Sequence, residues 1–495
     1  MWFWHHSTTL FWPIAVLILY TIVTHPLRKF PGPFLCSVSN LPFSIWFNSG
    51  RKEFTIHALH DKYGPVVRIA PNELSFNTAQ SWKDIYGFRT GHQSFLKSEW
   101  NEGVSFADQG VHGVISSRDP KEHAHMRRYL SHAFSAQALK EQEVLVHEIV
   151  DMLVRRIREI GVEKGEVMDL ERWLRMCTFD ITGSLVLGRS FDAVKDGGQH
   201  PSVKFIHEAL QQMKVVDTMK RLPILGKLLA LLSLRALMKV MHANTAHEQF
   251  CINIIKERLS NPSARPDFLT RLQDVHNEES DKPVDIQLAA HSSELLVAGS
   301  DTSNTTLVTL LNFVLRDTSI YNQLCTQIRT KFSTYEAINA QDAASIPFIR
   351  PLILEAMRIY PPVPFGLPRT VPSSGDTVDG CFIPGGTTVS TNALSAALSE
   401  KNFVRPLEYI PARWEKSAAE HSTDSLEASQ PFSLGSRGCL GQNLAWVEMN
   451  LILCKLIWSF DLELVNKDMD LHRDSKTNIL WESPPLHIRV TDRRR

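Results

Sequence analysis

Apolar residues recur along most of the chain at intervals of three and four, which is the spacing of a helix that buries one face. The clearest example covers residues 145–160, and similar patterns cover 203–258 and 286–313. A further apolar run at 444–460 directly follows a glycine-rich loop. These segments predict a protein built mainly from α-helices.

Two shorter stretches carry residues that favour β-strands. Residues 63–76 alternate around a Pro-Asn-Glu turn and predict a hairpin, and residues 377–391 are rich in Gly, Thr and Val. No flexible linker, repeat or long charge run divides the chain. We therefore expect a mainly α fold with a minor β component, arranged as a single large domain at 31–495.

The first 27 residues differ from the rest because they contain no Asp, Glu, Lys or Arg. Their apolar run at 10–23 has Trp and Tyr nearby and is followed by Arg28 and Lys29, as is typical of a membrane anchor. A full span needs about 20 residues, so the run is short for one. A secretory signal is the alternative, but Pro-Gly-Pro at 31–33 replaces the small-residue cleavage site. We expect residues 1–30 to form a retained anchor with its basic flank in the cytosol.

A second strongly apolar segment, residues 222–237, has Lys227 and Arg235 among its leucines. This composition suits a helix on a membrane surface, and a buried core helix is the alternative. The chain as a whole has 53 basic and 53 acidic residues, so its charge does not favour nucleic acid as a partner.

The seven cysteines include no pair at CxxC spacing, and their number is odd. This pattern favours neither a disulfide scaffold nor a zinc site. Cys439 differs from the others because Gly435, Gly438 and Gly441 surround it and an apolar helical run follows. A thiolate at the start of a helix is a good ligand for a metal such as haem iron, and a purely structural turn is the alternative.

Three other patterns contain candidate chemistry. Gly299, Asp301 and Thr302 interrupt an apolar helix, where they predict either an opening with a proton relay or a polar patch facing solvent. Glu355 and Arg358 are spaced to form an ion pair on one helix face. His123 and Arg127 also share a helix face, which predicts either a clamp for an anion or a solvated basic surface.

Taken in chain order, these patterns resemble the cytochrome P450 family of haem-thiolate monooxygenases. The loop is similar to the family signature Phe-x-x-Gly-x-Arg-x-Cys-x-Gly at Phe432, Gly435, Arg437, Cys439 and Gly441. The central helix matches at Ala298, Gly299, Asp301 and Thr302, and the charged triad at Glu355, Arg358 and Arg413. The likeness covers essentially the whole chain.

The resemblance implies haem b with Cys439 as the axial ligand of its iron and dioxygen as co-substrate. It implies propionate contacts from Arg437, His123, Arg127 and Arg369, although many microsomal members have Trp at the position of His123. Asp301 and Thr302 would deliver protons, and the charged triad would hold the fold behind the haem. A substrate pocket would be lined by Leu296, Val297, Val363, Pro364 and Phe365, for which core packing is the alternative.

No nucleotide-binding fingerprint occurs, so the resemblance implies that a membrane-bound, NADPH-dependent flavoprotein reductase supplies the electrons. It places the chain in the endoplasmic reticulum membrane, with the catalytic domain facing the cytosol. We expect hydroxylation of a hydrophobic small molecule in fungal secondary metabolism, such as a terpenoid, polyketide or alkaloid. Epoxidation, desaturation and multistep oxidation need no different motif. An isomerase or dehydratase that uses no dioxygen, and a gas or redox sensor, remain as alternatives.

Overall fold

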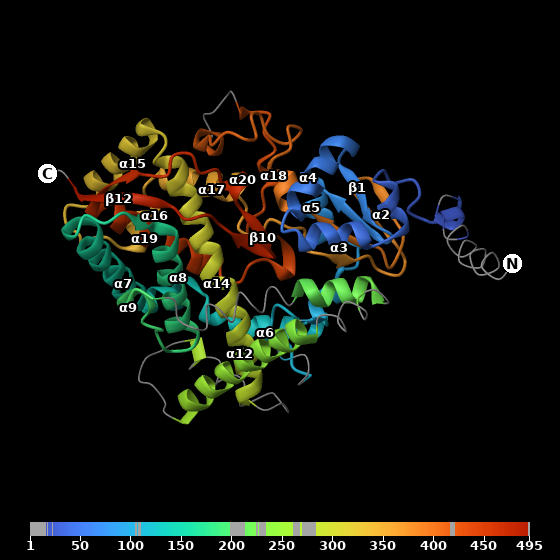
Figure 1. The fold of residues 1–495 in the computed structure, drawn as a ribbon, viewed down its shortest axis with the longest axis horizontal. Coiled ribbons are helices and arrows are strands. Elements are labelled where there is room, and N and C mark those ends of the chain that lie inside the picture. The colour runs from blue at the N-terminus through green and yellow to red at the C-terminus, as the bar shows by residue number, and fades with distance from the viewer. Residues whose placement is uncertain are drawn as a thin grey trace.

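The computed structural model of the protein describes residues 16, 18–21, 23–103, 106, 110–198, 213–223, 226, 234–260, 268–269, 284–415 and 421–493. Helix makes up 57% of the structure and strand 10%, which confirms the mainly helical fold with a minor sheet component. One end of the molecule contains the sheet with β1, and the other consists mainly of helices, with the strand β12 among them (Figure 1).

Ten helices form most of this framework. They are α4 (Lys52–Tyr63), α5 (Ala79–Tyr86), α6 (Pro120–Ala133), α7 (Ala136–Ile157), α8 (Leu170–Val186), α12 (Leu234–Ser260), α14 (Val284–Val314), α15 (Thr318–Lys331), α17 (Ile349–Ile359) and α19 (Gln442–Ser459). The remaining labelled helices are α2 (Phe34–Val38), α3 (Leu41–Asn48), α9 (Ala193–Asp196), α16 (Ala340–Ala344), α18 (Ala393–Ala397) and α20 (Leu471–Asp474). The long helices predicted from periodicity at 145–160, 286–313 and 444–460 correspond to α7, α14 and α19. Part of the predicted pattern at 203–258 forms α12, and residues 203–212 lie outside the described part.

The largest sheet has the strand order β1-β2-β8-β5-β3. Its strands are β1 (Val66–Ala70), β2 (Glu73–Phe76), β3 (Leu96–Lys97), β5 (Arg369–Thr370) and β8 (Thr388–Thr391). β1 and β2 form the predicted antiparallel hairpin, with Val66 opposite Phe76. β2 pairs in parallel with β8, so residues more than 300 positions apart in the chain meet in one sheet.

Three smaller sheets complete the fold. β4 (Met168–Asp169), β12 (His487–Asp492) and β9 (Phe460–Leu464) form one sheet in that order. β10 (Lys476–Asn478) pairs with β11 (Leu480–Glu482), and β6 (Asp376–Val378) pairs with β7 (Cys381–Ile383). The predicted β-rich stretch at 377–391 thus contributes strands to two different sheets.

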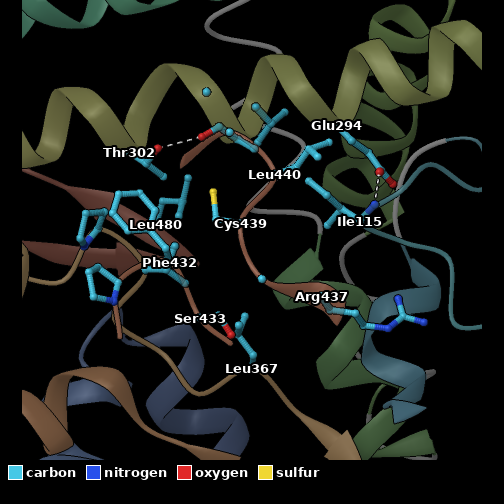
Figure 2. Close-up of a pocket in the computed structure, with 18 of the residues that line it drawn as sticks. Ile115, Glu294, Thr302, Leu367, Phe432, Ser433, Arg437, Cys439, Leu440 and Leu480 are labelled. Atoms are coloured by element: carbon cyan, nitrogen blue, oxygen red, sulfur yellow. Dashed lines mark hydrogen bonds between the residues drawn. The ribbon is translucent and has the colours of Figure 1, made fainter. Parts of the chain in front are cut away.

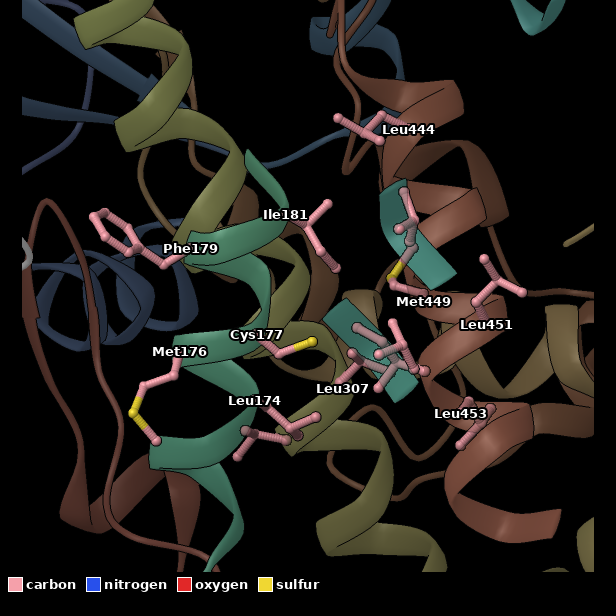
Figure 3. Packing of buried hydrophobic residues seen from close by; sticks show 14 of the residues in the cluster. Leu174, Met176, Cys177, Phe179, Ile181, Leu307, Leu444, Met449, Leu451 and Leu453 are labelled. Carbon is pink, nitrogen blue, oxygen red and sulfur yellow. The ribbon is translucent and has the colours of Figure 1, made fainter. Parts of the chain in front are cut away.

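The core of the helical end is built around α8 and α14, which pack along each other in the middle of the molecule (Figure 1). Every residue of α8 except Arg172 and Ser184 is buried, so this helix has neighbours on all sides. Figure 3 shows its apolar side chains beside Leu307 of α14 and the leucines of α19. This packing fixes α8 and α14, which both contribute to the wall of the cavity beside the cysteine loop.

The predicted charged triad is a fully buried network, with its three side chains 0% exposed. Arg358 donates from Nε to Glu355 Oε2 at 2.9 Å and from Nη2 to Oε1 at 2.8 Å. Arg413 Nε reaches Glu355 Oε1 at 3.0 Å. Arg358 also donates to the carbonyls of Ala397 and Pro406, both at 2.8 Å, and thereby ties irregular chain to α17.

Among the described residues, no helix combines the length and hydropathy that crossing a bilayer requires. The predicted anchor at 1–30 includes residues 1–15, 17 and 22, which lie outside the described part. Within the predicted apolar helix at 222–237, residues 224–225 and 227–233 also lie outside the described part.

Removing one member of the buried network should destabilise the fold far more than removing a surface ion pair. Arg358→Met leaves the Glu355 carboxylate buried with fewer donors, and we expect the free energy of unfolding to fall by about 3–5 kcal/mol. Arg489→Met is the matched control, because Arg489 and Glu463 form an exposed pair at 3.1 Å. That pair should contribute less than about 1 kcal/mol. Denaturant unfolding measures both losses of stability. Equal losses would contradict the prediction that the buried network stabilises the fold more than the exposed ion pair does.

Candidate functional site

A cavity of about 710 Å³ lies between α14 and the loop that precedes α19. Figure 2 shows the Cys439 sulfur pointing from this loop toward α14, where the side chain of Thr302 lies. The cavity wall combines apolar groups from several elements with a few charged ones. A largely apolar cavity with converging polar groups is typical of a small-molecule site.

The shape of the cysteine loop depends on Gly435. This residue begins a short 3₁₀ turn, Gly435–Arg437, with φ at +70°, and a Cβ there would lie 2.0 Å from the carbonyl oxygen of Tyr86. A side chain is therefore excluded by both the backbone conformation and the close contact. Two residues beyond the turn, the Cys439 N–H donates to the carbonyl of Phe432 at 2.7 Å, which closes the loop beneath the cavity.

Cys439 stands at the start of α19, as the sequence predicts. The Sγ atom is open to the cavity but has protein on the remaining sides, and this burial raises the pKa of the thiol. The Gly441 N–H and the Arg127 guanidinium oppose that rise, because both favour a negative sulfur. A bound metal cation would add the positive charge that keeps such a thiolate deprotonated.

Five basic side chains gather on one side of the cavity. They are Lys97, His123, Arg127, Arg369 and Arg437. No carboxylate of the described residues lies within 4.0 Å of their nitrogen atoms. They are held mainly by backbone carbonyls: Arg437 donates to Ser117 O at 2.7 Å and Arg118 O at 3.0 Å, and Arg127 to Gly438 O at 2.7 Å.

The pKa values of these five groups are all lowered, in each case mainly by burial. The pKa falls to about 7 for Lys97, about 3 for His123 and about 10 for Arg437, because neighbouring guanidinium groups add repulsion. The carboxylates of Glu294 and Asp119 oppose these shifts at Lys97 and Arg437 but do not cancel them. The two propionates of a haem would add further negative charge, so the residues present fit the predicted cofactor.

The glycine at 441 also fits a cofactor beside the loop. No protein atom lies closer than 3.9 Å to a Cβ built at this position, so packing within the protein does not require a glycine there. Gly441 and Phe432 both line the cavity, as do Cys439 and Arg437. The structure thus brings together around one cavity every predicted cofactor residue except Gly435. Gly435 does not line the cavity, but it forms the turn that shapes the cysteine loop.

The central helix differs from the prediction in two respects. α14 is helical without interruption from Val284 to Val314, so the predicted opening at Gly299 is absent. Gly299 instead allows a close helix contact, because a Cβ there would lie 2.8 Å from Thr182 Cγ2 of α8. Thr302 lines the cavity, and its hydroxyl donates to the carbonyl of Ala298 at 2.9 Å (Figure 2).

Asp301 does not line the cavity with Thr302. Its Oδ1 lies 3.6 Å from Nη1 of Arg175 on α8, and its side chain is buried. Adjacent helical residues point about 100° apart, so the two members of the predicted pair face different neighbours. The polar patch facing solvent, which was the alternative for this segment, is also wrong because Asp301 is only 6% exposed.

The predicted substrate pocket is partly corrected. Val297, Val363 and Phe365 line the cavity, whereas Leu296 and Pro364 do not. Leu296 is fully buried in the helical core on another face of α14, which is the packing alternative given for it above. Pro364 is buried as well, and its carbonyl accepts a hydrogen bond from the Leu394 N–H of α18 at 3.1 Å.

Sequence patterns missed several cavity residues because these residues belong to no motif. Glu294 accepts hydrogen bonds from the backbone N–H groups of Ile115, at 2.5 Å, and Ser116, at 3.0 Å. Glu448 of α19 lines the cavity and is fully buried, with Ser303 as its partner. The available signal for Glu448 was a single acid within the apolar run at 444–460.

Comparison with known proteins agrees with this geometry. The family model described as cytochrome P450 matches residues 32–490. Cytochrome P450 monooxygenase ORF11 of Penicillium roqueforti (strain FM164) is 45% identical over 92% of this chain and 94% of its own length. Cytochrome P450 monooxygenase BipB of Cochliobolus sativus is 36% identical, covering 96% and 94%. Cytochrome P450 monooxygenase aclL of Aspergillus oryzae (strain ATCC 42149 / RIB 40) is 35% identical, covering 96% of both chains.

The close contact at Gly435 predicts that an added methyl group displaces the cysteine loop. We expect Gly435→Ala to lose most of its bound haem, because the new Cβ meets the Tyr86 carbonyl and φ is positive. Gly380→Ala is the matched control: φ there is +73° and no atom lies within 4 Å. Haem absorbance per protein measures the effect, and equal losses in both variants would show that backbone strain alone is responsible.

Proposed function

The chain belongs to the cytochrome P450 family of monooxygenases, and on that basis we propose that it hydroxylates a hydrophobic small molecule at carbon, with Cys439 as the haem ligand. One observation supports this assignment above the others. Cys439 presents an accessible sulfur in the cavity, with five basic groups on one side and Thr302 on the facing helix. A structural turn, which was the alternative for this loop, needs neither the cavity nor the basic groups.

Haem, when bound, would supply the redox chemistry that activates dioxygen, and a thiolate ligand to its iron would favour cleavage of the O–O bond. The residues of this chain hold and orient the group. The Cys439 thiolate accepts a hydrogen bond from the Gly441 N–H. The propionates would be bound by Arg369 and Arg437, together with Lys97, His123 and Arg127. Burial keeps the imidazole of His123 neutral, so it would serve as a hydrogen-bond donor rather than as a charge.

We propose that the hydroxyl of Thr302 positions a proton donor beside the oxygen atom that reacts. Its hydroxyl occupies the cavity wall, where it bonds to Ala298 O, and from there it can accept a hydrogen bond from water or a substrate. The proton-delivery role of Asp301 stays a prediction, since its carboxylate faces Arg175. The presence of Thr302 in the wall favours a reaction with dioxygen over an isomerase or dehydratase.

The wall of the cavity supports a mainly apolar substrate. Val297, Val363, Phe365 and Leu480 contribute apolar surface, and Asn101 and Ser293 contribute polar groups that would orient one or two oxygen atoms of the substrate. The relatives come from Penicillium, Cochliobolus and Aspergillus, which supports a fungal secondary metabolite such as a terpenoid, polyketide or alkaloid. Hydroxylation, epoxidation, desaturation and multistep oxidation would all use this same wall.

We further propose that an NADPH-dependent flavoprotein reductase supplies the electrons and that residues 1–30 hold the protein on the endoplasmic reticulum, facing the cytosol. The absence of a nucleotide-binding fingerprint supports the first part. The uncharged apolar run at 10–23 followed by Arg28 and Lys29 supports the second.

Replacing the sulfur tests the functional assignment directly. Cys439→Ser should lose the thiolate-type spectrum of the reduced carbon monoxide complex and all NADPH-driven product formation, because a hydroxyl is a poor ligand for this iron. Cys381→Ser is the control, since Cys381 lies on β7 outside the cavity wall. The substrate panel contains terpenoid, polyketide and alkaloid precursors, with the protein and reductase in microsomes.

The other outcomes of this experiment identify the alternatives. A thiolate-type spectrum with product formed without NADPH would indicate the isomerase or dehydratase. A thiolate-type spectrum that responds to gases, with no product from any panel member, would indicate the sensor. A Cys439→Ser protein with an unchanged spectrum would overturn the ligand assignment.

Removing the predicted anchor tests its role. We expect the full chain to sediment with microsomes and to resist extraction by salt, and a chain starting at residue 31 to move largely into the soluble fraction. Arg28→Ala with Lys29→Ala is the control, because it changes the flank and keeps the apolar run. Equal sedimentation of the full and shortened chains would contradict the anchor.

A further inference from the structure

The protein has a second cavity, of about 550 Å³, which adjoins the basic side of the cysteine cavity. The two cavities have four basic wall residues in common: His123, Arg127, Arg369 and Arg437. Most of the remaining wall comes from the end of α5, the loop after it and α6. Figure 2 shows the Arg437 side chain extending away from the Cys439 sulfur. The proposed haem site uses the first cavity, so the second is a separate space beside the same cations.

The loop after α5 forms the outer wall of the second cavity and is held by Asp376 of β6. The carboxylate of Asp376 lies 2.7 Å from Arg89 Nη2 and 2.8 Å from His92 Nδ1. Asp84, at the end of α5, is also 3.9 Å from Arg89. The basic groups of this loop are therefore paired within the protein, and the wall that they form is in place before any ligand arrives.

Two arginines on the other walls are not paired in this way. Arg369 is only 5% exposed, and its one hydrogen bond to the described residues goes to the carbonyl of Pro368 at 3.1 Å. A guanidinium has five N–H donors, so most donors of Arg369 remain for ligands in the two cavities that it lines. Arg128 of α6 is exposed and makes no hydrogen bond or ion pair with any described residue. Buried donors and clustered cations of this kind favour an anion.

The propionates of a haem would not balance all of this positive charge. Besides Arg89, the second cavity is lined by the guanidinium groups of Arg127, Arg128, Arg369 and Arg437. A haem has two propionates, and the exposed carboxylate of Asp119 also attracts Arg437. Four cations thus face three anions, and positive charge remains beside the second cavity.

We propose that the second cavity binds a phosphate group, either of the free ion or of a phosphate ester, with donors from Arg128 and Arg369. Arginine suits this ligand because its planar fork donates two parallel hydrogen bonds to phosphate oxygens. The inference rests on the proposed haem site, whose propionates take the other donors of the shared wall. A negative ligand beside the propionate edge opposes the addition of an electron to the haem, so the anion is an effector of its reduction.

The first test measures binding to the haem-loaded full chain by calorimetric titration. The two probes are inorganic phosphate and adenosine monophosphate, with sodium chloride added to keep the ionic strength constant. Wild type should bind in a saturable manner. Arg128→Gln should bind about tenfold more weakly, as expected for the loss of one charged donor, with unchanged haem absorbance. Tighter binding of the nucleotide would identify an ester as the ligand, and equal binding would identify the free ion.

Lys121→Gln is the matched control for this titration. Lys121 is an exposed cation of α6 that lines neither cavity, so this variant removes the same charge from the same helix. Its affinity for phosphate should stay close to that of wild type, because exposed charges outside the site are screened by salt. Equal weakening in Lys121→Gln and Arg128→Gln would show attraction to the helix as a whole and would overturn the site.

The second test uses the oxidation state of the haem. Phosphate should bind about threefold more weakly after reduction, which corresponds to a fall of about 28 mV in the midpoint potential, since a tenfold change equals 59 mV for one electron. Spectroscopic redox titrations with and without saturating phosphate measure this fall. Lys121→Gln should show it in full, and Arg128→Gln should show little of it at the same phosphate concentration. Equal affinity in both oxidation states would overturn the effector role.

These readouts distinguish failure of this inference from failure of the proposed function. A wild-type protein without the thiolate-type spectrum would overturn the haem assignment and the effector role that depends on it. A haem-loaded wild type that forms product but binds neither probe would overturn the phosphate site alone. Binding that is unchanged in Arg128→Gln would also overturn the site.

Discussion

The buried carboxylate of Glu355 is the interaction on which the cysteine loop ultimately depends. The chain from α18 to the loop has few regular elements, so it is fixed by contacts to α17 rather than by its own ladders. Glu355 accepts hydrogen bonds from the Ile410 N–H and the Trp414 indole at 2.9 Å, in addition to those from Arg358 and Arg413. Five hydrogen bonds from four residues to one fully buried carboxylate anchor the path of the chain toward Cys439.

Most charged groups of the cavity wall lie on one side. Arg437, Arg369 and Lys97 gather there, with Glu294 close enough to attract Lys97, whereas Glu448 is held by a serine in another part of the wall. This arrangement would favour one orientation of a dianionic cofactor, because the cations that its acidic edge would meet lie mainly on one side.

Much of the fold and of the cofactor loop could be predicted because short-range rules determine them. Helical spacing located α7, α14 and α19, and the glycines around Cys439 pointed to a tight turn that the structure places at Gly435. Long-range features were less accessible. Whether Asp301 or Thr302 faces the cavity depends on the rotation of α14 against α8, and the same rotation directs Leu296 into the core. Glu448 was missed because its partner, Ser303, is 145 positions away in the sequence.

The contact between Gly435 and Tyr86 links the cysteine loop to the β-sheet end of the molecule. The hydroxyl of Tyr86 donates to Leu367 O at 2.8 Å and accepts from the Thr391 N–H at 3.1 Å, while the carbonyl oxygen of Tyr86 lies close to Gly435. Because this contact is made by a main-chain oxygen, many side chains at position 86 would leave it in place. An insertion or deletion within α5 would shift the carbonyl itself, so the length of α5 constrains viable variants more strongly than its composition does.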